Sequence, residues 1–140
     1  MIAFISIIAL INYFLSFLGT SLEIILGYLF QPLAWSMGIP WEDSGAIGSL
    51  LGKKIVFTEL IAFGDLKEMI DGNMISNRSA IITSYALCGF ANFGSIGIQI
   101  GGIGGIAPGR KKDISELVFK AMIGGALASF ITASIAGILI

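Results

Sequence analysis

The stretch CGFANFGS, residues 88–95, lies in the middle of residues 79–109, a run of 31 residues without a charged side chain. The run is apolar enough to lie inside a membrane, and Asn92 and Ser95 are polar interruptions near its centre. An amide or a hydroxyl at that depth costs free energy unless it has a partner, so such groups usually face a bundle interior, a cavity or a ligand. We therefore expect Asn92 and Ser95 to belong to a functional polar site inside a membrane segment.

The composition is that of an integral membrane protein. Of the 140 residues, 56% are hydrophobic and 12% are charged, whereas soluble domains carry about 25% charged residues. The net charge of −1 comes with no basic tail, which argues against a nucleic-acid partner. The chain has no histidine, so histidine metal sites and histidine acid–base catalysis are excluded. We expect no enzyme activity, no metal site and no cofactor, and we expect the single cysteine, Cys88, to be a small buried hydrophobe.

Three stretches are long enough to cross a membrane as helices: residues 2–20, 79–105 and 117–140. Each is near or above the roughly 20 residues that a helix needs to cross about 30 Å of hydrocarbon. The first stretch also resembles a signal peptide, but no Lys or Arg precedes Lys53, so a transmembrane helix is favoured. The predicted organisation is a transmembrane scaffold helix, an interfacial helix with a connector, a re-entrant hairpin, a broken transmembrane helix and a last transmembrane helix, at residues 1–20, 21–43, 44–70, 79–106 and 116–140.

The predicted hairpin contains two short apolar stretches separated by charge. Residues 46–51 are apolar, the stretch from Gly52 to Glu59 contains Lys53 and Lys54, and a second apolar stretch ends at residue 63. Neither half is long enough to span, and a helix that folds back at membrane depth is tolerated only where protein or water surrounds its tip. We expect a break that contains charge, with Glu59 near the tip in a functional role. Lys53 and Lys54 are expected to extend toward water or to pair with Glu59.

The 31-residue run is predicted to be interrupted. As one straight helix it would be about 46 Å long, which is more than a bilayer core requires, and it contains eight glycines. Gly94 and Gly97 follow Asn92, and a discontinuity there would leave backbone groups free to bind a ligand. The alternative is that these glycines only allow helices to pack closely, an interpretation favoured for residues 101–105.

The charges also predict an orientation. The connector Arg110-Lys111-Lys112 precedes the last predicted span, whereas residues 21–50 contain acidic residues and no Lys or Arg. Because cytoplasmic connectors are enriched in Lys and Arg, we expect residues 110–112 to be cytoplasmic and the hairpin to enter from the outer side of the plasma (inner) membrane. Trp35 and Trp41 fit either an aromatic belt at the interface or ordinary core packing.

Three phrases resemble the C-terminal part of the concentrative nucleoside transporters: GKKIVFTEL at 52–60, YALCGFANFGSIGIQIGGIG at 85–104, and Ala107-Pro108. The resemblance extends over essentially the whole chain. In that family, two inverted repeats each supply a re-entrant hairpin and a broken helix, and the substrate binds between them near the midplane of the membrane. The resemblance implies an all-α integral membrane fold, of which this chain is the second repeat, one half of an inverted-repeat transporter.

The resemblance also implies a binding site. Glu59 on the hairpin, with Asn92 and Ser95 on the broken helix, would hydrogen-bond the ribose hydroxyls of a nucleoside, and Phe90 would lie against the sugar. A carboxylate accepts from hydroxyls, and an amide both donates and accepts, so these groups suit a sugar in a dehydrated cavity.

Two neighbouring residues would support this site, Thr58 and Gly94. The family usually has an asparagine immediately before the hairpin glutamate, and Thr58 keeps a hydroxyl there but lacks the amide. The polar network around Glu59 therefore departs from the pattern of the family.

The first hairpin and the broken helix that follows it have no counterpart among these 140 residues. In the family that segment carries the nucleobase contacts and the site of the coupling cation, sodium or proton, so we expect the chain alone not to perform coupled transport. The leading hypothesis is the C-terminal half of a cation-coupled nucleoside symporter, which is a homotrimer in its full-length form by resemblance. In such a symporter the hairpin and the broken helix move against a scaffold that contains the first helix. The alternative is a stand-alone membrane binding or assembly module with the same hairpin and no transport activity.

Overall fold

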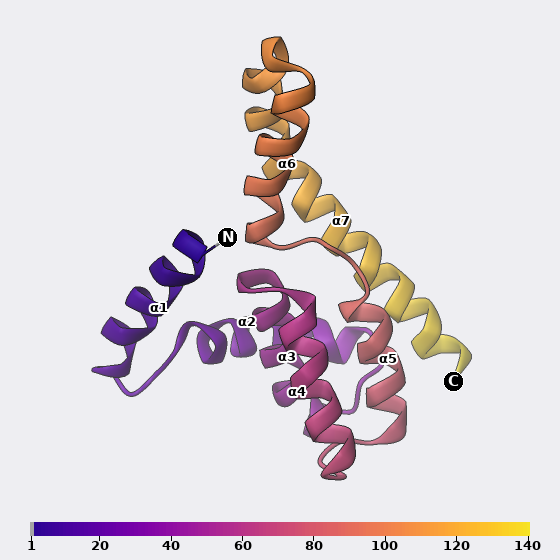
Figure 1. The fold of residues 1–140 in the computed structure, drawn as a ribbon. Coiled ribbons are helices and arrows are strands. Elements are labelled where there is room, and N and C mark those ends of the chain that lie inside the picture. The colour runs from indigo at the N-terminus through magenta and orange to yellow at the C-terminus, as the bar shows by residue number, and fades with distance from the viewer. Residues whose placement is uncertain (1) are drawn as a thin grey trace.

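The computed structural model describes the backbone of residues 2–140 and the side chains from residue 6 onward. The regular elements in this part of the chain are all helical, which confirms the all-α prediction (Figure 1). They are α1 (Ile2–Ser16), α2 (Leu22–Ser36), α3 (Trp41–Val56), α4 (Glu59–Asp71), α5 (Asn77–Leu87), α6 (Phe93–Ile106), a short 3-10 helix η1 (Pro108–Arg110) and α7 (Lys111–Leu139).

Helices α3 and α4 form a hairpin whose tip is Phe57 and Thr58. The sequence predicts a break that contains charge, and this is wrong, because Lys53 and Lys54 lie inside the last turn of α3. Basic side chains are favourable there, since the last turn of a helix carries the negative end of its dipole. Glu59 is the first residue of α4 and lies beside the tip.

Helices α5 and α6 are separated by residues 88–92, so the 31-residue run is indeed broken. The predicted position of the break, at Gly94 and Gly97, is wrong: both glycines lie inside α6. The turn is made earlier, by Gly89 at φ +154°, a conformation that side chains with a Cβ rarely adopt. Cys88 is exposed rather than buried, because it belongs to this break and not to a packed helix face.

Helix α7 runs alongside both α5 and α6 and so bridges the break between them (Figure 1). It begins at Lys111, earlier than the sequence predicts, because the basic connector is itself helical. Together with η1 it forms the one helix in the described part of the chain that is long and apolar enough to cross a membrane, Pro108–Leu139. Helix α1 ends at Ser16 instead of extending to residue 20, and Gly19 turns the chain at φ +70°.

Helix α2 packs along α3 through glycines, a contact that the sequence reasoning misses. Gly45, Gly48 and Gly52 lie three and four residues apart and face α2. A Cβ on Gly48 would overlap the carbonyl oxygen of Gly27 and lie 2.9 Å from the backbone nitrogen of Gln31. The two backbones therefore approach as closely as small residues permit.

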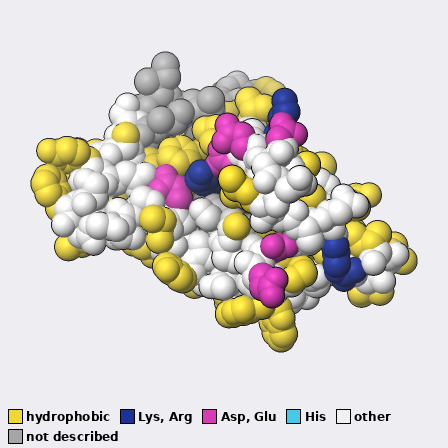
Figure 2. Space-filling model, turned by 90° about the horizontal axis from the view of Figure 1, so that it is seen from below, with side chains coloured by type: hydrophobic (Ala, Val, Ile, Leu, Met, Phe, Trp, Pro, Cys, Tyr) yellow, Lys and Arg dark blue, Asp and Glu magenta, His cyan; other side chains and the backbone are white. Residues whose placement is uncertain are grey.

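The core lies where α2, α3, α4, α5 and α7 meet, and many large apolar side chains remain on the outside of the molecule. In Figure 2, hydrophobic side chains spread over the visible face, and the charged ones are confined to a few small groups. Such a surface suits a chain in lipid, where outward apolar side chains face hydrocarbon. The buried core residues are Ala34, Met37, Ile39, Ile47, Leu50, Leu51, Ala62, Leu66, Ile82, Ala86, Leu87, Ala91, Met122, Ala126, Phe130 and Ala133.

We expect Gly48→Ala to destabilise the chain by about 1 to 3 kcal/mol, because the added methyl group forces α2 away from α3. Gly64→Ala is the matched control, since a Cβ there meets no atom within 4 Å and alanine favours the helix by up to about 1 kcal/mol. Thermal unfolding of the purified chain in detergent measures both. Equal midpoints for the two variants would contradict the close packing of α2 on α3.

Asp43, at the end of the hairpin opposite its tip, links α3 to the start of α5. Its Oδ2 atom accepts hydrogen bonds from the Ser79 hydroxyl at 2.6 Å, the Ser76 hydroxyl at 2.9 Å and the Ser76 backbone N–H at 3.0 Å. Burial alone would raise the pKa of this carboxyl group, but the three hydrogen bonds outweigh it, so the pKa lies below its ordinary value of 3.8.

A lowered pKa in the folded state predicts how stability depends on pH. The contribution of Asp43 is fully present above the ordinary pKa of 3.8 and is lost as the pH falls through the lower pKa of the folded state. Between neutral pH and about pH 3, we expect the unfolding midpoint of Asp43→Asn to fall less than that of the unchanged chain. Parallel pH profiles for the two proteins would show that Asp43 does not link α3 to α5 in this way.

Candidate functional site

The hairpin and the broken helix meet at Glu59 and Asn92. Asn92 Nδ2 donates to Glu59 Oε2 at 3.1 Å, which joins the first residue of α4 to the residue that precedes α6. Ser95 lies one turn further along α6, and its hydroxyl donates to the Asn92 carbonyl oxygen at 2.6 Å. The structure thus brings together the three polar residues that the sequence singles out, in a chain of hydrogen bonds.

Asn92 is also the N-cap of α6. Its Oδ1 accepts from the Ser95 backbone N–H at 2.8 Å, and the Ser95 hydroxyl accepts from the Asn92 backbone N–H at 3.4 Å. This reciprocal arrangement satisfies two backbone donors at the start of the helix. Asn92 and Ser95 are 1% and 4% exposed, so their partners replace solvent.

The three residues retain hydrogen-bonding capacity beyond these contacts. Asn92 uses one of its two Nδ2 hydrogens on Glu59, and Glu59 Oε1 makes no hydrogen bond to another described residue. A carboxylate has about four acceptor positions, and the amide keeps one donor. The site therefore offers an acceptor and a donor side by side, which is the pattern that a pair of adjacent hydroxyl groups can use.

A recess of about 250 Å³ opens beside the break and α7. Phe90 and Ser95 line it, and the Phe90 side chain is 66% exposed, so its ring is available to a ligand. Gln99 lines the same recess and was not predicted. Its signal in the sequence is its spacing, because it lies four residues after Ser95 and so on the same face of α6.

The two supporting residues have different surroundings. Thr58 is the N-cap of α4, but its side chain makes no capping hydrogen bond, so the start of α4 lacks the partner that a capping side chain usually supplies. Gly94 lies close to the hairpin tip: a Cβ there would be 3.2 Å from Asn92 Oδ1 and 4.0 Å from the Phe57 carbonyl oxygen.

The break itself is held by two other elements. The Ser129 hydroxyl of α7 donates to the Cys88 carbonyl oxygen at 3.0 Å, and a Cβ on Gly89 would lie 2.5 Å from that hydroxyl oxygen. On the hairpin side, Lys54 Nζ donates to the Ala86 carbonyl oxygen at 2.8 Å. Carbonyl groups that lose their helical partners at the end of α5 are thereby satisfied.

The two lysines of α3 therefore have different roles. Lys54 is fully buried, so the prediction that it extends toward water is wrong, and neither lysine forms an ion pair with Glu59. Lys53 instead pairs with Asp65 of α4. Successive residues of a helix point about 100° apart, so the continuation of α3 through both lysines sends them to different faces.

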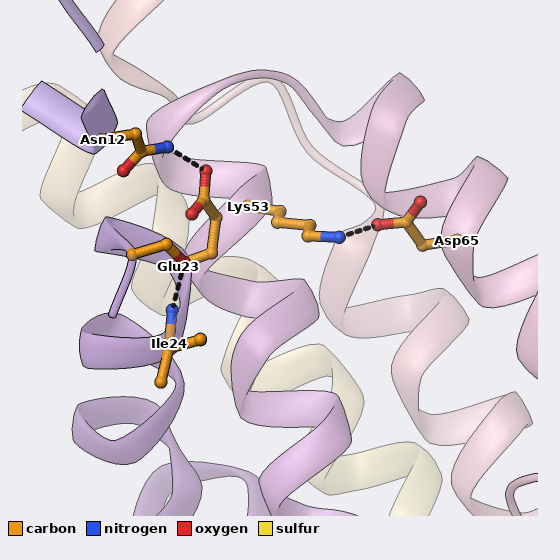
Figure 3. A network of polar contacts seen from close by, with 6 residues as sticks. Asn12, Glu23, Ile24, Lys53 and Asp65 are labelled. Carbon is orange, nitrogen blue, oxygen red and sulfur yellow. Dashed lines mark hydrogen bonds and ion pairs between the residues drawn. The ribbon is translucent and has the colours of Figure 1, made fainter. Parts of the chain in front are cut away.

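A larger recess of about 490 Å³ lies between α2, α3 and α4, and none of the predicted site residues lines it. Figure 3 shows Asn12 donating to Glu23 and Lys53 paired with Asp65. The hydrogen bond from Asn12 to Glu23 is 2.8 Å long. The charged groups in this recess have partners on the neighbouring helices. The recess beside the break is smaller, but two of the predicted site residues, Phe90 and Ser95, line it.

Comparison with known proteins identifies the family. A family model described as "Na+ dependent nucleoside transporter C-terminus" matches residues 1–137. The chain belongs to this family. The resemblance to the concentrative nucleoside transporters is thus confirmed, and with it the all-α transporter fold.

Relatives and solved structures agree with this assignment. The chain is 39% identical over 159 residues to the mouse "Sodium/nucleoside cotransporter 1", matching 99% of this chain and 24% of the relative. It is 42% identical over 147 residues to the "Uncharacterized transporter YutK" of Bacillus subtilis (strain 168), matching all of this chain and 36% of the relative. The structure of CNTnw in an inward-facing substrate-bound state is similar with a TM-score of 0.86 at 41% identity, over 97% of this chain and 34% of CNTnw. The chain thus spans about a quarter to a third of the length of these proteins.

Two substitutions of Asn92 separate its capping role from its contact with Glu59. Asn92→Ala removes the cap and is expected to lower the stability of the purified chain by about 1 kcal/mol or more. Asn92→Asp keeps an oxygen for the Ser95 N–H but replaces the donor to Glu59 with a like charge, so we expect α6 to remain capped while the contact with Glu59 is lost. Amide hydrogen exchange at residues 93–96 reports the cap, and faster exchange in Asn92→Asp than in Asn92→Ala would contradict it.

Proposed function

We propose that this chain supplies the ribose-binding half of a cation-coupled nucleoside symporter. The observation that carries the proposal is the hydrogen-bonded chain Glu59–Asn92–Ser95 at the junction of the hairpin and the broken helix. The comparison with known proteins supports the proposal, because relatives of the chain are named as nucleoside transporters, among them the mouse sodium/nucleoside cotransporter. Relatives of this kind are transporters rather than enzymes.

The chemistry of the site suits a sugar. In our proposal Glu59 accepts from the ribose hydroxyls, Asn92 donates to one of them, Ser95 holds Asn92 in place and contacts the sugar, and the exposed ring of Phe90 packs against it. A ribose carries two adjacent hydroxyl groups, each able to donate and to accept. An analogue that lacks one of them leaves a buried polar group without a partner, which is the usual basis of strong discrimination.

The other properties of the symporter are part of the same proposal. The nucleobase contacts and the ligands of the coupling cation, sodium or proton, are placed in the part of the relatives that these 140 residues do not span, so the chain needs that part for transport. The symporter is proposed to be a homotrimer in the plasma (inner) membrane, with residues 110–112 on the cytoplasmic side.

Similarity to CNTnw is nearly the same for an inward-facing, an outward-facing and an intermediate state, with TM-scores of 0.86, 0.85 and 0.87. The chain thus resembles the three states about equally. In our proposal the hairpin and the broken helix move against a scaffold that contains α1.

Uptake by a chimera tests the proposal. Residues 1–140 replace the matching segment of the mouse cotransporter, and uptake of labelled uridine is measured per molecule at the cell surface. We expect Glu59→Gln, Asn92→Asp and Ser95→Ala each to lower kcat/KM by fivefold or more, because a lost hydrogen bond to a buried polar group costs about 1 to 3 kcal/mol. Glu68→Gln is the matched control, since it removes an exposed carboxylate from the same helix.

Substrate analogues make the test specific for ribose. The unchanged chimera should prefer uridine to 3′-deoxyuridine, and Glu59→Gln should reduce that preference toward one. Unchanged uptake by all three site variants would remove the assignment of the site. A chimera that reaches the surface but takes up no nucleoside would favour the alternative, a membrane binding or assembly module without transport.

A further inference from the structure

Lys54 is the one charged side chain that is fully buried in the described part of the chain, at 0% exposure. Burying an ammonium group is unfavourable unless its hydrogens find partners. No carboxylate of the described residues lies within ion-pair distance of Lys54 Nζ. Its contacts are instead the Ala86 carbonyl oxygen at 2.8 Å and the face of the Phe130 ring, whose centre is 5.5 Å away.

These contacts place a positive charge at the end of α5. The last carbonyl groups of a helix lack helical donors and carry the negative end of the helix dipole, so a cation is stabilised there. A Cβ built on Gly89 would lie 3.7 Å from Lys54 Nζ, so the ammonium group also lies against the turn itself. Lys54 therefore links the hairpin directly to the residues that make the break.

Glu59 makes the second link, on the other side of the same break. Lys54, from the last turn of α3, bonds Ala86 before the break, and Glu59, from the start of α4, bonds Asn92 after it. The two side chains are also near enough to attract each other electrostatically. Two side chains that flank the tip of the hairpin therefore contact the two ends of the break. Lys54 contacts the end of α5, and Glu59 contacts the start of α6.

We propose that Lys54 is a positioning residue for the nucleoside site, a tethered cation that fixes the end of α5 against the hairpin and so sets the placement of Asn92 opposite Glu59. It touches no substrate and acts through Glu59 and the break. This inference rests on the proposed function for its effect on binding, whereas the link between Lys54 and the break is independent of it. A side chain that only filled the core would be replaced by an unbranched apolar side chain of similar length with little effect.

The test compares Lys54→Met with Lys53→Met in the uridine-uptake chimera. Both variants remove one positive charge from the same turn of α3, but Lys53 is partly exposed and pairs with Asp65. We expect Lys54→Met to raise KM by about tenfold or more, with a smaller change in kcat, because a misplaced binding group weakens recognition. Lys53→Met should stay within about twofold of the unchanged chimera, as exposed ion pairs contribute little.

A double substitution separates positioning from a structural role. If Lys54 acts through Glu59, adding Lys54→Met to Glu59→Gln should change KM by less than about twofold, since the two losses are not additive. An unchanged KM in the single variant, or a full additional loss in the double variant, would overturn the proposal.

Hydrogen exchange of the purified chain tests the link without any nucleoside. Backbone amides of residues 88–92 should exchange faster in Lys54→Met than in Lys53→Met, because the end of α5 loses its cation. Equal exchange in the two variants overturns the link. If the chimera shows no preference for ribose but the exchange difference is present, the proposed function fails, and Lys54 is then a structural residue of the hairpin rather than a positioning residue for a sugar.

Discussion

A helix that is interrupted in apolar surroundings leaves backbone carbonyl and N–H groups without partners, and the rest of this structure is arranged to supply them. Each such group costs several kcal/mol in a medium without water. The carbonyl oxygens of Ala86 and Cys88 accept from Lys54 of the hairpin and Ser129 of α7. At the start of α6, the backbone N–H groups of Asn92 and Ser95 each donate to the side chain of the other residue. The hairpin and α7 must therefore lie on either side of the break, and this requirement fixes how the three segments pack.

The same requirement explains why the hairpin is held at both ends. At the end opposite the tip, Asp43 links α3 to the start of α5, and beside the tip Glu59 contacts Asn92. Along its length the glycines of α3 let α2 approach closely, which gives the hairpin a support on the side away from α5. The hairpin is thus fixed to its neighbours at its end, at its tip and along one flank.

The sequence singles out three polar residues that the structure brings together, but it predicts the positions of the breaks poorly. Glu59, Asn92 and Ser95 are conspicuous because they are polar in apolar surroundings, and that signal does not depend on the exact helix bounds. The break was expected at Gly94 because glycine is permissive, but the N-capping pair Asn92 and Ser95 makes Gly94 helical and moves the turn to Gly89. The roles of Lys54 and Gln99 could not be predicted from the sequence for another reason. They depend on which faces of two helices pack together, and a single sequence does not specify this.

Asn92 serves both the fold and the proposed binding site, and this double role limits what a substrate must change on binding. Its Oδ1 is committed to the cap of α6 and one Nδ2 hydrogen to Glu59, so the amide plane is fixed before any ligand arrives. In our proposal, a ribose hydroxyl then meets a donor and an acceptor that are already oriented, and little side-chain entropy is lost on binding. Position 92 therefore tolerates few substitutions. A replacement must both cap α6 and donate a hydrogen bond to Glu59. The start of α6 and the proposed recognition of the sugar therefore depend on one side chain.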